Sequence, residues 1–292
     1  MLKKVILCPN PYRDAQLRVA REAKRVLDEV NCPNVVCLPF KNQERPEGYG
    51  LTIEPLQQEL RGADMIIAFG GDGTILHLSK TAAHKDIPVL GVNLGSLGFM
   101  AELESRELAR LRGLCEGNYE IESRMMLDVS VQREGRTIYS NLALNEALIA
   151  RGNVSRVIRL RIDTEQGKLM DIAGDGVIVA SPTGSTAYSL SAGGPVVEPT
   201  ARNFIVSPIC AHSVHANSYV LSPERVISVQ TEKNGYKPVL LSVDGGRAFS
   251  LRSGDSVEVR RSKFDTKLVR LGKRSFCEIL QKKMLGGYSD EE

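Results

Sequence analysis

The sequence of 292 residues predicts a two-domain protein, with an α/β domain followed by a β-rich domain. Over the first hundred residues, short apolar runs alternate with stretches of helical spacing, which is the pattern of a parallel sheet covered by helices. After about residue 100, runs of alternating apolar and polar residues are separated by turn residues, which is typical of antiparallel hairpins. We therefore expect an antiparallel, β-sandwich-like second domain.

The elements of the first domain follow in order. Residues 3–7 predict a strand, and Asp14 is placed to cap the helix that comes next. A short strand is expected at 35–38 and a short helix at 52–60. The remaining elements are a buried strand at 65–69, a helix at 74–83 and a second buried strand at 89–92.

Hairpins account for most of the second domain. Strand-like runs flank the turn pairs Glu134-Gly135, Gln166-Gly167, Asn234-Gly235 and Gly254-Asp255. Residues 275–284 return to helical spacing, and we expect this last helix to pack on the first domain. The expected domains are therefore 1–100 together with 266–292, and 101–265.

Composition argues against several classes of protein. The net charge is +3 and the cationic runs are short, so nothing indicates a nucleic-acid-binding surface. No apolar run approaches the roughly 18 residues of a membrane span, and the N-terminal apolar run is too short for a secretory signal. The six cysteines are scattered without a Cys-x-x-Cys pair, which indicates reduced thiols. We expect a cytoplasmic protein with no nucleic-acid or membrane partner.

A glycine-rich turn follows the strand expected at 65–69. It consists of Gly70, Gly71, Asp72, Gly73 and Thr74. Open α/β sheets bind ligands at the carboxyl ends of their strands, helix N-termini attract phosphate, and glycines allow positive φ and close approach to the backbone. A carboxylate repels phosphate, so Asp72 makes sense there if it handles a proton or a magnesium ion. A turn in which Asp72 caps the helix explains the residues equally well.

Three further segments carry polar residues that suit a nucleotide. They are a second glycine-rich turn at 93–103, the pair Asn145-Glu146, and residues 173–197. The last segment contains a second Gly-Asp-Gly, a Pro-Thr-Gly-Ser-Thr turn and a Gly-Gly-Pro. Small residues with hydroxyls and accessible N–H groups suit phosphates and riboses, whereas a structural turn alone does not require so many hydroxyls.

Together these motifs resemble those of the NAD kinase family over nearly the whole chain. Gly-Gly-Asp-Gly alone is shared with phosphofructokinases and diacylglycerol-type lipid kinases, whereas the later motifs are far more specific. The resemblance implies transfer of the γ-phosphoryl group of ATP to the 2′-hydroxyl of the adenosine ribose of NAD, giving NADP. It is carried by Gly70–Thr74, by Asn93-x-Gly95-x-Leu97-Gly98-Phe99, by Asn145-Glu146, and by Asp175-Gly176 with Pro182–Pro195.

The resemblance also implies roles for individual residues. Asp72 is implied as the acceptor of the hydroxyl proton. The implied phosphate-donor loop is Gly70, Gly71, Gly73 and Thr74. The implied NAD-binding residues are Asp72, Gly73, His77, Phe99, Asn145, Glu146, Arg156, Asp175, Thr186, Ala187, Tyr188, Ser189, Leu190 and Ser191. On chemistry alone, Phe99 is as well explained as a core residue and Arg156 as a surface charge.

The resemblance further implies Mg²⁺ bound with ATP, and a homodimer or homotetramer. His212 and His215 are spaced like metal ligands, but two histidines without an acidic neighbour make a weak site, so we expect no protein-held metal. The chain departs from the family pattern at Ala173 and at 211–219. The sequence leaves open whether inorganic polyphosphate replaces ATP and whether NADH is accepted.

Two other interpretations remain. One is a lipid kinase of the same superfamily, which the lack of a membrane-seeking amphipathic stretch and the presence of Asn145-Glu146 and Thr186-Ala187-Tyr188 argue against. The other is a dinucleotide-binding regulator without catalysis, which the intact Asp72 and its glycine turn argue against.

Overall fold

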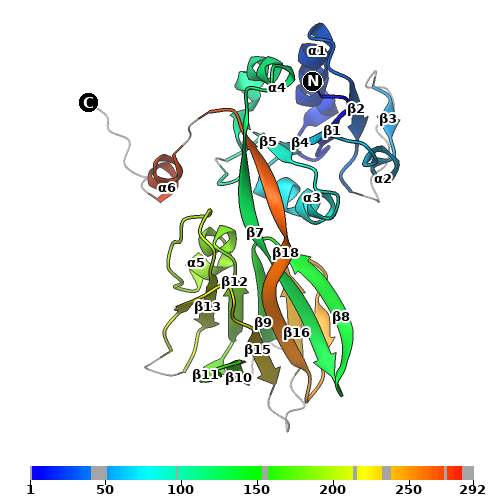
Figure 1. Cartoon of the computed structure of the whole chain (residues 1–292). Helices are drawn as coiled ribbons and strands as arrows, with labels where there is room; N and C mark the ends of the chain where they lie inside the picture. Colours follow the sequence, from blue (N-terminus) through cyan, green and yellow to red (C-terminus); the bar gives the residue numbers. More distant parts are fainter. Residues whose placement is uncertain are drawn as a thin grey trace, which may run out of the picture. The chain divides into compact units, whose positions relative to one another are not determined.

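The computed structural model describes residues 2–40, 51–96, 98–152, 157–212, 216–231, 238–272 and 275–284. The chain forms two compact units, Met1–Ser123 with Thr266–Glu292, and Arg124–Asp265. It passes from the first unit to the second within strand β7 (Glu120–Arg133) and returns within β18 (Ser256–Arg270) (Figure 1).

The first unit is longer than the expected 1–100 because the next residues pack onto its sheet. Strand β6 (Leu103–Glu104) pairs in parallel with β5 (Val89–Asn93). The 3₁₀ helix η2 (Ser105–Leu111) and helix α4 (Arg112–Cys115) bury leucines in the same core. The hairpin-rich unit therefore begins later than residue 101, because the two units divide between residues 123 and 124.

The first unit contains the parallel sheet that the sequence predicts. Its strands lie in the order β5-β4-β1-β2-β3, and the last residues of β18 pair with β5 on the other side. All of these pairings are parallel, and β1 and β4 are buried at every position. Strand β1 is Val5–Pro9, β2 is Asn34–Cys37, β3 is Ile53–Glu54 and β4 is Met65–Gly70.

The expected helix at 52–60 was half wrong. Ile53 and Glu54 form β3 and pair with Val36 and Cys37, and helix α2 covers only Leu56–Glu59. Hydrogen bonding to the open edge of β2 decides the conformation of these residues, and local helical spacing does not reveal that edge.

Helices cover both faces of this sheet (Figure 1). Helix α1 (Arg18–Glu29) follows the 3₁₀ turn η1 (Ala15–Leu17) and packs with η2 and α4 on the face of Leu90 and Val92. Helix α3 (Asp72–His84) lies on the opposite face, where a Cβ on Gly91 would come within 2.5 Å of Ile75 Cδ1. Asp14 caps α1 as predicted, because its carboxylate accepts the N–H groups of Val19 and Ala20 at 2.9 and 3.0 Å.

The second unit is a sandwich of antiparallel strands. One sheet has the order β14-β13-β12-β9-β16-β17, and the other contains β11-β10-β15-β18 with β7 and β8 beyond β18. Alternate apolar side chains of both sheets form one buried cluster, as period-two strands require. The bounds are β8 Arg136–Ala143, β9 Glu146–Arg151, β10 Ile158–Thr164, β11 Gly167–Gly174, β12 Gly176–Ala180, β13 Phe204–Ile209, β14 Tyr219–Leu221, β15 Ile227–Thr231, β16 Val239–Val243 and β17 Phe249–Leu251.

Turn chemistry explains these hairpins. Glu134 and Gly135 both have positive φ (50° and 75°), as a tight two-residue hairpin turn requires, and Gly254 has φ of 87°. The predicted turn at Asn234-Gly235 lies outside the described residues. The outer face of β12 and β13 is covered by the segment that contains η3 (Thr183–Thr186) and helix α5 (Tyr188–Ser191).

The last helix belongs to the first unit. Helix α6 (Phe276–Met284) places the Phe276 ring 6.1 Å from the ring of Phe99, centroid to centroid. Among the described residues, no helix is both long enough and apolar enough to cross a membrane. All six cysteines are free thiols, of which Cys210 and Cys277 are exposed.

Candidate active site

Asp72 lies at the first position of α3, directly after the glycine turn that ends β4. The turn does not use the positive φ expected of its glycines: the backbone of Gly71 is extended, and Gly70, Gly71 and Gly73 are absent from the positive-φ residues. Two of these glycines instead leave space, because a Cβ on Gly71 or Gly73 would meet no atom within 4 Å. Gly70 serves close packing, since a Cβ there would lie 2.2 Å from Thr74 Oγ1.

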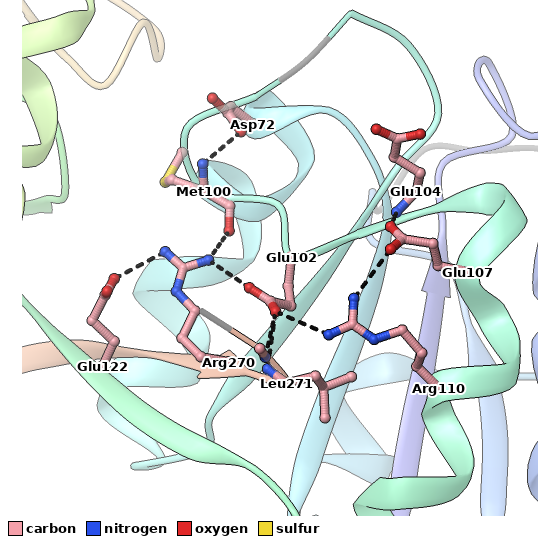
Figure 2. Close-up of polar contacts among 10 residues, drawn as sticks. Asp72, Met100, Glu102, Glu104, Glu107, Arg110, Glu122, Arg270 and Leu271 are labelled. Carbon is pink, nitrogen blue, oxygen red and sulfur yellow. Dashed lines mark hydrogen bonds and ion pairs between the residues drawn. The ribbon is translucent and has the colours of Figure 1, made fainter. Parts of the chain in front are cut away.

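The carboxylate of Asp72 is held by the second glycine-rich turn. The N–H of Phe99 donates to Oδ2 at 2.8 Å. The N–H of Met100 donates to Oδ1 at 3.1 Å (Figure 2). Gly98 makes this approach possible, because a Cβ there would lie 2.2 Å from Oδ1. A carboxylate has about four acceptor positions, so about two remain for a substrate.

Two predicted ligand residues lie in the same unit. The exposed His77 packs against Phe40 with ring centroids 4.5 Å apart and the rings tilted by 43°. Its Nε2 lies 2.9 Å from the carbonyl oxygen of Pro39. Phe99 is half-buried against Phe276, and Lys283 Nζ lies 4.4 Å from the centre of its ring. Phe99 is therefore neither a core residue nor a freely exposed one.

In the second unit, the pair Asn145-Glu146 opens strand β9. Asn145 Oδ1 and Glu146 Oε2 are buried and have no hydrogen-bond partner within the described chain. Buried polar atoms of folded proteins are almost always partnered, so these two oxygens are available to accept hydrogen bonds from water or a ligand.

Asp244 holds the backbone of Asn145 and Glu146 in place. Its carboxylate accepts the N–H groups of Leu144, Asn145 and Glu146 at 2.9, 2.8 and 3.1 Å, and its own N–H donates to the Glu146 carbonyl at 3.0 Å. Burial and, second, the nearby Asp244 charge raise the pKa of Glu146 to about 7. Glu146 therefore changes its charge near neutral pH.

The other predicted residues of this unit have different surroundings. Asp175 Oδ2 accepts from Arg151 Nη2 at 3.0 Å, so its charge is balanced within the chain. Tyr188 is 43% exposed, whereas Ser189 is fully buried and its hydroxyl lies 3.1 Å from Ser207 Oγ. Ser189 thus faces the interior, while Thr186, Ala187, Leu190 and Ser191 are half-buried or exposed. Arg156, which the sequence also suggests, lies outside the described residues, as does His215.

The residues that sequence reasoning missed are those that hold the predicted ones. Arg151, Glu102, Arg270 and Asp244 make their contacts across long sequence separations. Glu102 lies within the glycine-rich segment 93–103, but its residue type and spacing did not single it out there, and Arg270 lies in no motif. The full burial of Glu102 and the several contacts of Arg270 become visible only in the folded structure.

No cluster of three or more His, Cys, Asp or Glu side chains able to hold a metal ion occurs in the part of the chain that the structure describes. The glycine turn offers the single carboxylate of Asp72. Mg²⁺ is usually bound by one or two carboxylates together with substrate phosphates, so this donor set fits a magnesium ion that arrives on ATP.

Comparison with known proteins identifies the family. Residues 5–119 match the ATP-NAD kinase N-terminal domain, and residues 144–271 match the ATP-NAD kinase C-terminal domain. The NAD kinase of Natranaerobius thermophilus is 39% identical over 98% of this chain and 99% of its own. That of Symbiobacterium thermophilum is 42% identical over 76% of this chain and 79% of its own.

Two solved structures are similar over nearly the full length. Yeast NADH kinase complexed with NADH has a TM-score of 0.83 and 25% identity, covering 100% of this chain and 89% of that one. An NAD kinase from Archaeoglobus fulgidus in complex with ATP has a TM-score of 0.73 and 25% identity, covering 97% and 98%. The sequence matches and the fold lead to one conclusion: this chain belongs to the NAD kinase family.

Proposed function

We propose that this protein is an NAD kinase that transfers the γ-phosphoryl group of ATP to the 2′-hydroxyl of the adenosine ribose of NAD, giving NADP and ADP. Family membership over the whole chain supports the reaction. The observation that carries the chemistry is the carboxylate of Asp72, held by two backbone N–H groups at the end of the open glycine turn.

In this proposal Asp72 accepts the proton of the 2′-hydroxyl while that oxygen attacks the γ-phosphorus. The new bond joins the ribose oxygen to phosphorus, and the bond to the β-phosphate oxygen breaks, so ADP leaves with that electron pair. Phosphoryl transfer depends mainly on positioning and on stabilisation of charge. Phe99 and Met100 fix the direction of the base, while the N-terminus of α3 and the unobstructed Gly71 and Gly73 provide N–H groups for the donor phosphates.

Mg²⁺ would be held chiefly by the phosphates of ATP, with Asp72 as the carboxylate available at the turn. When bound, it supplies positive charge that offsets the phosphate oxygens.

The NAD-binding roles in the second unit are part of the proposal. The unpartnered oxygens of Asn145 and Glu146 suit the amino group of adenine and the hydroxyls of ribose, which are donors. Asp175 keeps acceptor capacity beside Arg151, and the exposed ring of Tyr188 offers a flat surface to a base or a nicotinamide ring. His77, Phe99 and Arg156 remain predicted NAD contacts, as do Gly73, Thr186, Ala187, Leu190 and Ser191. Ser189 is proposed only to support that segment from inside.

The test is a coupled assay in which NAD, ATP and magnesium are supplied and NADP is read through an NADP-specific dehydrogenase. We expect turnover by the wild type and a fall in kcat of about a hundredfold or more for Asp72→Asn, because general base catalysis contributes about 10²–10⁴. Asp86→Asn is the matched control: it makes the same change just after the other end of α3, where the Asp86 side chain is 76% exposed. Near wild-type kcat for Asp72→Asn would exclude the assigned base.

The donor and the rival functions are distinguished in the same assay. Polyphosphate in place of ATP tests the second donor, and a diacylglycerol substrate tests the lipid kinase. If neither donor gives NADP while NAD still binds to folded protein, the chain is a dinucleotide-binding regulator.

We also propose a homodimer or homotetramer, on the family resemblance, and a cytoplasmic location, on the six free cysteines. The mass in solution, measured by light scattering, tests the first. Fractionation of the source cells tests the second.

A further inference from the structure

Glu102 is a fully buried carboxylate with several donors around it. It lies between the turn that holds Asp72 and strand β6, and its exposure is 0%. Its Oε1 accepts the N–H groups of Leu271 and Gly272, both at 3.0 Å, and its Oε2 accepts from Arg270 Nη1 at 3.3 Å. Arg110 Nη2 lies 3.9 Å from Oε1. Within the first unit, Glu102 thus connects residues 270–272, at and just after the end of β18, to the segment that precedes β6 (Figure 2).

Arg270 connects this carboxylate to the candidate active site. Its Nη1 also donates to the carbonyl oxygen of Met100 at 3.2 Å, and its Nη2 donates to Glu122 at 2.9 Å. The N–H of the same Met100 donates to Asp72. Both polar backbone groups of Met100 are therefore fixed, one by Arg270 and the other by the proposed base (Figure 2).

The backbone between Met100 and Glu102 has little freedom to move. The N–H of Glu102 donates to the carbonyl of Gly91 at 2.9 Å, and a Cβ on Gly91 would lie 2.9 Å from Ala101 Cα. Strand β5 and the segment therefore pack backbone against backbone. A change in the orientation of the Arg270 guanidinium would reach Asp72 through a single residue, Met100.

Stability alone does not require a charged group at position 102. A buried ion pair pays a large desolvation cost, and apolar residues of similar volume often give equal or greater stability. What the ion pair does supply is a fixed geometry, since the carboxylate determines where the planar guanidinium lies.

We propose that Glu102 is a positioning residue for phosphoryl transfer: it orients Arg270, which holds the Met100 peptide that directs the carboxylate of Asp72. This inference rests on the proposed role of Asp72 as the base. Glu102 touches no substrate in this scheme and acts only through Arg270 and Met100.

Glu102→Gln is the principal test because it keeps the shape of the side chain. Its amide oxygen can still accept from Leu271 and Gly272, whereas its NH₂ group then faces Arg270 Nη1, donor against donor. Arg270 then keeps its ion pair with Glu122 but no longer holds the carbonyl oxygen of Met100. We expect kcat per folded molecule to fall about ten- to a hundredfold, since a displacement of about 1 Å costs up to about 10². The KM values for NAD and ATP should stay within about threefold of wild type, because the ligand contacts remain.

Arg110→Gln is the matched control. Arg110 is the second guanidinium beside Glu102, but it pairs with Glu107 at 3.1 Å and makes no contact with Met100. We expect its kcat to stay within about twofold of wild type. At position 270, Arg270→Lys keeps the charge and should retain more kcat than Arg270→Gln, which removes it. These two variants carry the test if Glu102→Gln does not fold.

A second readout separates positioning from general damage. If Glu102 acts through Asp72, then adding Glu102→Gln to Asp72→Asn should leave the residual kcat almost unchanged, because the base is already absent. An equal loss in both backgrounds would overturn the inference, as would wild-type kcat for Glu102→Gln and Arg270→Gln. Near wild-type kcat for Asp72→Asn alone is a different result, and it refutes the proposed function itself.

Discussion

We predict that the stability of Glu146→Gln relative to wild type increases as pH rises from acidic to alkaline values, in the ligand-free protein. Burial and the nearby Asp244 raise the pKa of Glu146 from 4.5 to about 7 in the folded protein. An unfolded glutamate ionises near 4.5, so the folded state resists this ionisation and loses stability as pH rises from about 4.5 to about 7. Above pH 7 both states are ionised and no further stability is lost.

The magnitude follows from that difference. Each pKa unit corresponds to about 1.4 kcal/mol, so the full penalty above pH 7 is about 3 kcal/mol. At pH 5.5 about 1 kcal/mol of it is already present, which leaves about 2 kcal/mol between pH 5.5 and pH 8.5. Glutamine cannot ionise, so whatever Glu146→Gln costs through its own hydrogen bonds is the same at both pH values.

The assay is thermal unfolding of wild type and variant at pH 5.5 and 8.5. The difference in Tm between them should move in favour of Glu146→Gln by about 4–8 °C at the higher pH, at about 2–4 °C for each kcal/mol. Glu198→Gln, which changes an exposed glutamate of the same unit, is the control and should show no comparable change. An equal difference between wild type and Glu146→Gln at both pH values would refute the reasoning.

Two further predictions concern groups that hold the site. Gly98→Ala places a Cβ 2.2 Å from Asp72 Oδ1 and should lower kcat by about tenfold or more; Gly113→Ala, where the nearest atom is 3.7 Å away, is the control in the coupled assay. Asp244→Asn keeps an oxygen for Asn145 and Glu146 but turns an NH₂ group toward the Leu144 N–H, so urea unfolding should show a loss of about 1.5–3 kcal/mol. The same variant removes the charge that helps to raise the pKa of Glu146, so its stability should depend less on pH between 5.5 and 8.5 than that of wild type. Unchanged pH dependence would contradict the electrostatic part of that argument.

Prediction from the sequence succeeded for features that a few neighbouring residues determine, such as a helix cap and a hairpin turn. Asp14 caps α1, and the Glu134-Gly135 pair turns a hairpin, because cap and turn preferences depend on a few neighbouring residues. The family signatures were likewise readable without coordinates, since they are runs of adjacent residues.

Prediction failed where a distant part of the chain decides the outcome. Residues 53 and 54 pair with the open edge of β2 although their own pattern suggested a helix. The contact between the hydroxyls of Ser189 in α5 and Ser207 in β13 was likewise not predicted, while the contact of Ser189 with NAD stays a prediction. In both cases the competing partner is absent from the local sequence.

The sequence by itself predicted the two-part architecture, the family and the residues proposed to carry the chemistry, because periodicity, turn preference and contiguous motifs are local properties. The tertiary structure alone decided how those residues are held. Glu102 and Arg270 lie 168 residues apart and meet only when β18 returns to β5. Asp244 and Leu144, 100 residues apart, meet only when β16 pairs with β9. Contacts at such separations are set by strand pairing and by the burial of charge, which no stretch of sequence expresses.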